Sequence, residues 1–217
     1  METNGMDSTK DFQRRVRQYW YEDGLIEIGA GCAILLIAGI YLSAALFMKG
    51  PVGALVTAFA PMLVILLWVL GGKKLIQTLK EKITYPRTGY VKYRQDPRTR
   101  SISRRVLVMI VAASVSGLVI LFAASIPKIY YAALTGIMAA AIMFILGYQA
   151  NVKRFYLVGI WVILSGLVIS FLPIVEPWDM PALVGSMGLG WIVSGIVALT
   201  NYLKHTSPAG PNYMEEL

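Results

Sequence analysis

The sequence predicts an all-α integral membrane protein, a helical bundle of six transmembrane helices in three hairpins, with both termini in the cytoplasm. The first observation is composition: 57% of the 217 residues are hydrophobic and 15% are charged, against about 45–50% and about 25% in soluble domains. The second is a series of continuous apolar stretches, each long enough to cross a bilayer. The third is the distribution of lysine and arginine, which divides the loops between two sides of the membrane.

Composition also excludes several function classes. The chain has too little charge to cover a soluble domain and too much hydrophobicity for disorder. Its single cysteine, Cys32, excludes a disulfide scaffold and a cysteine-rich metal site. The sequence contains no HExxH zinc-protease motif, no GxxxxGK[ST] phosphate-binding loop and no GxSxG nucleophile motif. We therefore expect no catalytic residues, no metal and no cofactor.

The predicted spans are helices because their apolar runs are continuous, whereas membrane strands alternate over about 10 residues. About 20 residues, at a rise of about 1.5 Å each, cross a hydrocarbon core of about 30 Å. In chain order the spans are residues 25–48, 52–70, 106–126, 129–149, 155–175 and 182–202. The corresponding segments are an amphipathic cytoplasmic N-terminal segment (1–24), hairpin 1 (25–70), a basic cytoplasmic loop (71–105), hairpin 2 (106–149), hairpin 3 (150–202) and a cytoplasmic tail (203–217).

Basic residues set the expected orientation. Of the 20 lysines and arginines, all but Lys49 and Lys128 fall in the N-terminal segment, the loop 71–105, the connection before the fifth span or the tail. Loops on the cytoplasmic side of a membrane carry an excess of lysine and arginine. The alternation therefore predicts that both termini face the cytoplasm.

The basic loop is the largest segment outside the spans. It begins with an amphipathic helical pattern that places Leu75, Ile76, Leu79 and Ile83 on one face. Its middle combines a turn with tyrosines and cations, and attraction to anionic headgroups contributes about 1 kcal/mol per basic residue near the surface. Nucleic acid is not expected, because the orientation already explains the charge. The candidate surface for lipid or a protein partner is Tyr85, Pro86, Arg87, Gly89, Tyr90, Lys92 and Arg94.

Two carboxylates at the start of the first span are candidate intramembrane groups. Glu27 is the only acidic residue inside a predicted span, and Asp23 lies one turn earlier on the same helix face. Ionisable residues in lipid are costly and mark functional sites, so the pair could relay protons or cations. The alternative is an interfacial carboxylate favoured by the helix dipole. In either case we expect an arginine of the N-terminal segment as the partner of Glu27.

The sixth span carries small residues at four-residue spacing. Such a stripe lets two helix backbones approach closely in lipid. It predicts either packing within the chain or an interface in a homo-oligomer. The stripe consists of Ala182, Ser186, Gly190, Ser194 and Ala198.

Two sequence segments carry a family resemblance. The segments are YWYEDGLIE at residues 19–27 and ITYPRTGYV at residues 83–91. Both resemble segments of uncharacterised bacterial polytopic integral membrane proteins, for which no activity is known. The resemblance implies a multi-pass protein of the bacterial inner (plasma) membrane. It also marks as positions of interest Asp23, Gly24, Glu27, Pro86, Arg87 and Gly89.

Three functions remain open from the sequence. The preferred one is a non-catalytic membrane subunit, scaffold or regulator that presents the basic loop to lipid or a protein partner. The second is a small-solute or ion transporter with Glu27 as the coupling carboxylate, although transporters usually place such groups near the bilayer midplane. The third is an intramembrane enzyme acting on lipid, for which the sequence lacks an acid–base constellation.

Overall fold

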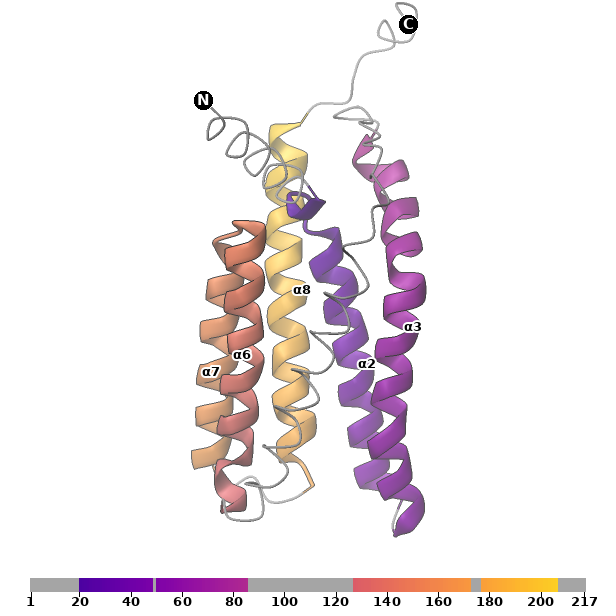
Figure 1. Ribbon diagram of the computed structural model, residues 1–217, viewed down its shortest axis with the longest axis vertical. Helices are drawn as coiled ribbons and strands as arrows, with labels where there is room; N and C mark the ends of the chain where they lie inside the picture. Colours follow the sequence, from indigo (N-terminus) through magenta and orange to yellow (C-terminus); the bar gives the residue numbers. More distant parts are fainter. Residues whose placement is uncertain (1–19, 49, 86–126, 173–176, 207–217) are drawn as a thin grey trace, which may run out of the picture. The chain divides into compact units, whose positions relative to one another are not determined.

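The computed structural model describes residues 20–48, 50–85, 127–172 and 177–206. Across these residues the secondary structure is helical without strands, and five helices are long and apolar enough to cross a membrane. They are α2 (Leu25–Phe47), α3 (Pro51–Ile83), α6 (Tyr131–Ala150, preceded by the 3-10 turn η1, Lys128–Tyr130), α7 (Arg154–Phe171) and α8 (Asp179–His205) (Figure 1). The described residues are thus all-helical, and the five apolar helices are compatible with a multi-pass membrane protein. The predicted third span, residues 106–126, lies outside the described residues.

The chain divides into two compact units, of which one is Tyr90–Tyr131 and the other comprises Met1–Gly89 with Ala132–Leu217. All the packing described below lies within the second, larger unit. Its helices α2, α6, α7 and α8 begin and end within a few residues of the predicted spans. Continuous apolar runs are thus sufficient to locate these helices.

Helix α3 differs from the expected division at residue 70. The predicted second span and the helical pattern at the start of the basic loop form one continuous helix of 33 residues. Gly71 and Gly72 do not interrupt it, because a helical glycine costs only about 1 kcal/mol. At about 1.5 Å per residue the helix is about 50 Å long, against about 30 Å for the hydrocarbon core. Helix α3 therefore extends well beyond the membrane interior.

Glycines bring α2 and α8 into close contact. Gly24 precedes α2 with a φ of 68°, a conformation that other residues rarely adopt, and a Cβ there would overlap the Gly195 carbonyl oxygen. A Cβ on Gly195 would in turn lie 2.8 Å from the Gly24 oxygen, and Gly31 and Gly188 approach each other in the same way one heptad further on. These small residues allow the tight backbone approach that stabilises helix pairs in lipid.

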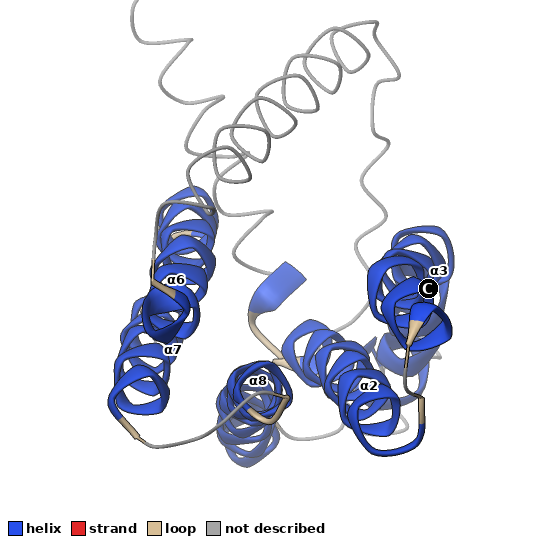
Figure 2. Cartoon of the chain, turned by 90° about the horizontal axis from the view of Figure 1, so that it is seen from below, coloured by secondary structure: helices blue, strands red, loops and turns tan. Residues whose placement is uncertain are grey.

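The other helices pack on either side of this pair. Helix α3 contacts α2, and α7 contacts α8, so that α8 lies between α7 and α2 (Figure 2). Helix α6 pairs with α7, since a Cβ on Gly136 would lie 2.9 Å from the Val162 oxygen. The Ser170 hydroxyl also accepts a hydrogen bond from the Ala133 amide at 2.9 Å.

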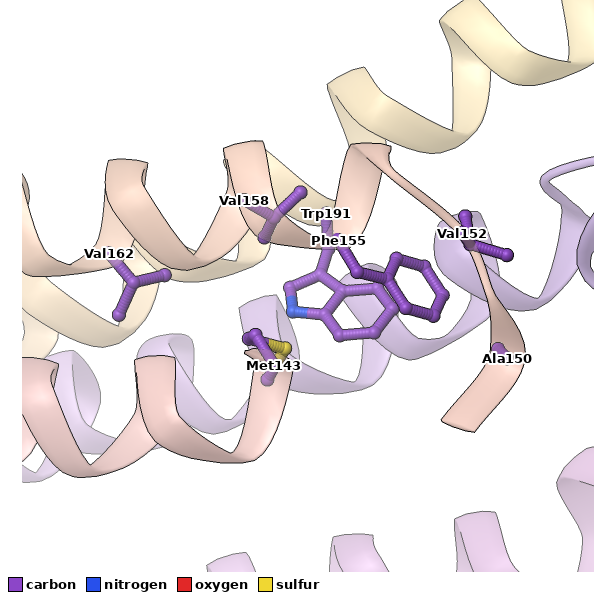
Figure 3. Close-up of a cluster of buried hydrophobic side chains, with 7 residues drawn as sticks. All are labelled: Met143, Ala150, Val152, Phe155, Val158, Val162 and Trp191. Atoms are coloured by element: carbon purple, nitrogen blue, oxygen red, sulfur yellow. The ribbon is translucent and has the colours of Figure 1, made fainter. Parts of the chain in front are cut away.

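An apolar cluster fills the space between α6, α7 and α8 (Figure 3). Its centre is Phe155, whose ring centroid lies 5.4 Å from that of Trp191 and 5.4 Å from that of Tyr21. The buried members are Met143, Ala150, Val152, Phe155, Val158, Val162 and Trp191. By contrast, large apolar side chains such as Leu70 and Leu157 are about 70% exposed on the outer faces, as expected for helices surrounded by lipid.

Candidate functional site: a buried ion-pair cluster at the start of α2

The two carboxylates that the sequence singles out are both buried. The exposed fraction is 1% for Asp23 and 0% for Glu27. They stand one turn apart at the start of α2, but they bond to different helices. Asp23 bonds to the end of α3, whereas Glu27 bonds to α7 and α8.

Asp23 holds the end of α3. Nζ of Lys80 lies 2.9 Å from Oδ2 of Asp23, and the Thr84 hydroxyl donates to the same oxygen at 3.0 Å. The other oxygen, Oδ1, accepts a hydrogen bond from the Leu25 amide at 3.3 Å. Lys80 also donates to the Trp20 carbonyl at 2.7 Å and lies 4.6 Å from the centroid of the Trp20 ring, a cation–π contact.

Glu27 holds α7 and α8. Its Oε1 accepts a hydrogen bond from Nε of Arg154 at 2.6 Å and forms an ion pair with Nη2 of the same arginine at 2.6 Å. Its Oε2 accepts a hydrogen bond from the Ser194 hydroxyl at 2.6 Å. Nη2 of Arg154 also donates to the Tyr21 carbonyl. The arginine is 26% exposed while the glutamate is fully enclosed.

The ion-pair cluster, which we define as Asp23, Glu27, Lys80 and Arg154 with the hydroxyls of Thr84 and Ser194, is balanced in charge. It holds two carboxylates and two cations. A charge buried at low dielectric is tolerated only when its partners satisfy it, and here every carboxylate oxygen accepts at least one hydrogen bond. No group of three potential metal ligands occurs in the part of the chain that the structure describes. Through these contacts the cluster joins four helices, α2, α3, α7 and α8, and so acts as a structural clamp.

The partner of Glu27 in the described residues is Arg154, from the start of α7. The arginines of the N-terminal segment, one of which was the expected partner, lie outside the described residues. The sequence interpretation missed Arg154 and Lys80 because it assigned both cations to membrane orientation. For Lys80 a signal was present, since Gly72, Ile76, Lys80 and Thr84 follow at four-residue steps and all are buried.

The amphipathic pattern expected for 73–83 agrees with the structure at three of its four apolar positions. Ile76 is 2% exposed, and Leu79 and Ile83 are half-buried. The exception is Leu75, which is 54% exposed. The charged residues Lys73, Lys74, Glu81 and Lys82 are exposed, as expected for the polar face of such a helix.

The small-residue stripe of α8 contacts other parts of the same chain at each position. Ser186 donates to the Ser165 hydroxyl of α7 at 2.6 Å, and a Cβ on Gly190 would lie 2.7 Å from Trp161. Ser194 bonds to Glu27, Ala198 lies against Gly24, and Ala182 packs on a small apolar cluster that includes Leu183. The closest backbone approach to α2, however, uses Gly188 and Gly195, which are outside the stripe.

The candidate lipid or partner surface is described at one residue. Tyr85 follows the end of α3 and is half-buried. The other members, Pro86, Arg87, Gly89, Tyr90, Lys92 and Arg94, lie outside the described residues. The structure thus describes the end of α3 and the first residue of this surface, Tyr85.

Comparisons of the chain with protein-family models, with curated proteins and with solved structures give no match.

Proposed function

We propose that the protein is a non-catalytic membrane subunit, scaffold or regulator that presents its basic segment, residues 71–105, to anionic lipid headgroups, or to a protein partner, with the binding surface at residues 85–94 of that segment. The distribution of lysine and arginine supports cytoplasmic termini. The resemblance of residues 19–27 and 83–91 to segments of bacterial membrane proteins supports a bacterial inner membrane. In this proposal the ion-pair cluster holds the end of α3 in place, and the binding surface follows directly after that end.

The observation that carries the proposal is that Asp23 contacts the end of α3 through two side chains. Lys80 and Thr84 both bond to Oδ2 of Asp23, directly before the tyrosine- and cation-rich stretch 85–94. This buried and fully bonded contact fixes the end of α3, after which that stretch begins. Fixing one end lowers the entropy lost when the stretch binds, which raises its affinity for a surface.

The test compares digestion of the segment in two kinds of nanodisc. The full-length protein is placed in phosphatidylglycerol or phosphatidylcholine nanodiscs, and chymotrypsin cleavage after Tyr90 and Tyr93 is timed. We expect slower cleavage in phosphatidylglycerol, because each basic residue contributes about 1 kcal/mol of attraction to an anionic surface. The triple variant Arg87→Gln, Lys92→Gln and Arg94→Gln should abolish the difference.

A charge-matched control separates a defined surface from general charge. The control replaces three exposed lysines of α3, Lys73, Lys74 and Lys82, by glutamine. It removes the same charge and should keep most of the protection. Equal cleavage in both lipids, or equal loss in the two triple variants, would refute a lipid-binding surface at 85–94. Protection that follows a co-purified protein rather than the lipid would instead identify the partner.

A second candidate function is transport of a small solute or ion with Glu27 as the coupling carboxylate. The supporting observation is that Glu27 is completely buried in an apolar helix and that its Oε1 contacts both Nε and Nη2 of one arginine. Protonation of such a carboxylate would release Arg154, which is the kind of change that couples ion binding to helix movement. Proton and sodium flux into proteoliposomes, compared between the parent and Glu27→Gln, distinguishes this candidate from the first.

A further inference from the structure

A groove of about 390 Å³ lies between α7 and α8, within the range of about 300–1,000 Å³ found for ligand sites. Arg154, Leu157 and Trp161 of α7 form one wall, and Leu189, Val193 and Val197 of α8 form the other. Successive wall residues are three or four positions apart, so they follow one face of each helix. The groove therefore runs along the seam between the two helices.

Apart from one end, the groove is apolar and open to the outside of the bundle. Val193 and Leu157 are 58% and 69% exposed, so in a bilayer these walls face hydrocarbon. The far end is bounded by Trp161, whose Nε1 donates to the Ser186 carbonyl at 3.1 Å. Gly190 leaves room for this indole to lie against α8. Arg154 and Trp161 are about two helical turns apart, or about 10 Å.

The near end of the groove is cationic. Arg154 uses Nε and Nη2 to bond Glu27 and Tyr21, whereas its Nη1 makes no hydrogen bond with the residues described. Lys153 is exposed beside it, and Lys204 is exposed two turns beyond Val197 on α8. The groove thus has a long apolar part and one end with a guanidinium nitrogen left for an anion.

We propose that this groove binds one anionic glycerophospholipid, with an acyl chain along the apolar walls and the phosphate at Nη1 of Arg154. Glu27 balances the charge of Arg154, so the exposed Lys153 and Lys204 supply the net positive charge that attracts an anion to this end. The N–H groups of Nη1 then orient it, because guanidinium groups bind phosphate oxygens in directed hydrogen bonds. The exposed apolar walls select a hydrocarbon chain that is present throughout the bilayer. The site is separate from the part of the basic segment that the structure describes, because none of residues 71–85 lines the groove.

The site is tested by native mass spectrometry of the full-length protein in detergent, titrated with phosphatidylglycerol or with phosphatidylcholine of the same chain length. Val193→Trp fills the groove at a lipid-facing position. Val168→Trp is the matched control, since Val168 is 55% exposed on α7 and does not line the groove. We expect Val193→Trp to weaken binding of the first phosphatidylglycerol about tenfold, while Val168→Trp binds as the parent does.

The role of the headgroup is tested by Arg154→Lys, which keeps a cation beside Glu27 but removes the guanidinium fork. We expect the preference for phosphatidylglycerol over phosphatidylcholine to disappear in this variant. The comparison of Val193→Trp with its control Val168→Trp tests the site even where Arg154→Lys fails to fold. Inorganic phosphate at millimolar concentration should not compete, because it lacks the acyl chain.

Several results would overturn the proposal. Equal affinity of the parent for the two lipids would show that Arg154 does not select the headgroup. Equal binding by Val193→Trp and Val168→Trp would show that the lipid lies elsewhere. Competition by inorganic phosphate would identify a simple anion site. A dimer that is lost on Val193→Trp would assign the groove to a second copy of the chain.

Discussion

Lys80 lies 2.9 Å from Asp23, and both side chains are almost completely withdrawn from the surface, at 2% and 1% exposure. The pair joins the last turns of α3 to the residue that precedes the first turn of α2. It therefore fixes the two ends of the first helical hairpin at the side of the membrane where the basic segment begins.

Removing one partner of this pair should be costly. Lys80→Met leaves the Asp23 carboxylate buried beside a single hydroxyl and an amide, and breaking a buried pair costs about 3–5 kcal/mol. We expect a clearly lower unfolding midpoint in detergent. Lys82→Met, at an exposed position of the same helix, is the control and should change little. The double variant Lys80→Met with Asp23→Asn should recover part of the loss; no recovery would show that the pair is not the cause.

The Glu27→Gln variant distinguishes a structural role of Glu27, in joining helices, from a role in transport. The amide keeps a contact for Ser194 but removes the charge that balances Arg154. If Glu27 only joins helices, the variant should lose about 3–5 kcal/mol of free energy of unfolding. Vesicles containing either the parent or the variant should then be as permeable to protons and sodium as empty vesicles. As a coupling group, Glu27 predicts flux in the parent that the variant lacks. Proteoliposomes with a pH-sensitive and a sodium-sensitive dye make the measurement.

The approach of α2 to α8 predicts a strong dependence on glycine. Gly195→Val should destabilise the protein by several kcal/mol, because its first carbon would lie 2.7 Å from Ile28 and 2.8 Å from the Gly24 oxygen, and overpacking typically costs about 1–3 kcal/mol or more. Gly24→Ala adds a positive φ to a similar overlap. The control is Gly39→Ala in α2, where nothing lies within 4 Å. That change should be neutral or stabilising by up to about 1 kcal/mol.

The proposed orientation is checked by labelling. In a Cys32→Ser background, a cysteine at Lys128 and one at Lys153 should react with an impermeant maleimide from opposite sides of the membrane, since both positions are exposed at opposite ends of α6. Intact cells should label the Lys128 position and opened cells should also label the Lys153 position. The reverse pattern would place the termini outside.

The spans could be predicted because lipid imposes a simple rule on composition. A continuous apolar run such as that of α7 or α8 satisfies its own backbone and needs no tertiary information. The junction at Gly71 and Gly72 was harder, because glycines and lysines mark the end of the hydrocarbon layer without ending the helix. Length and hydropathy therefore locate the membrane but not the end of α3.

The ion-pair cluster was only half predictable. Asp23 and Glu27 are conspicuous because carboxylates are rare in such a sequence. Their partners are inconspicuous, since Lys80 is one of many basic residues that membrane orientation already explains. Its four-residue register with Ile76 and Thr84 was a usable local signal. Arg154 had none, because its contact with Glu27 depends on how α7 packs beside α2.

The bond between Arg154 and Glu27 has a consequence for the timing of biosynthesis. The two residues are 127 positions apart, so at about 5–20 residues per second the ribosome reaches the arginine about 6–25 s after the glutamate. Asp23 waits a shorter time, because Lys80 belongs to the same hairpin. During the longer interval the nascent first helix carries an unbalanced carboxylate. A chain truncated before residue 154 would keep that carboxylate permanently unbalanced. We expect quality-control proteases to degrade such a product.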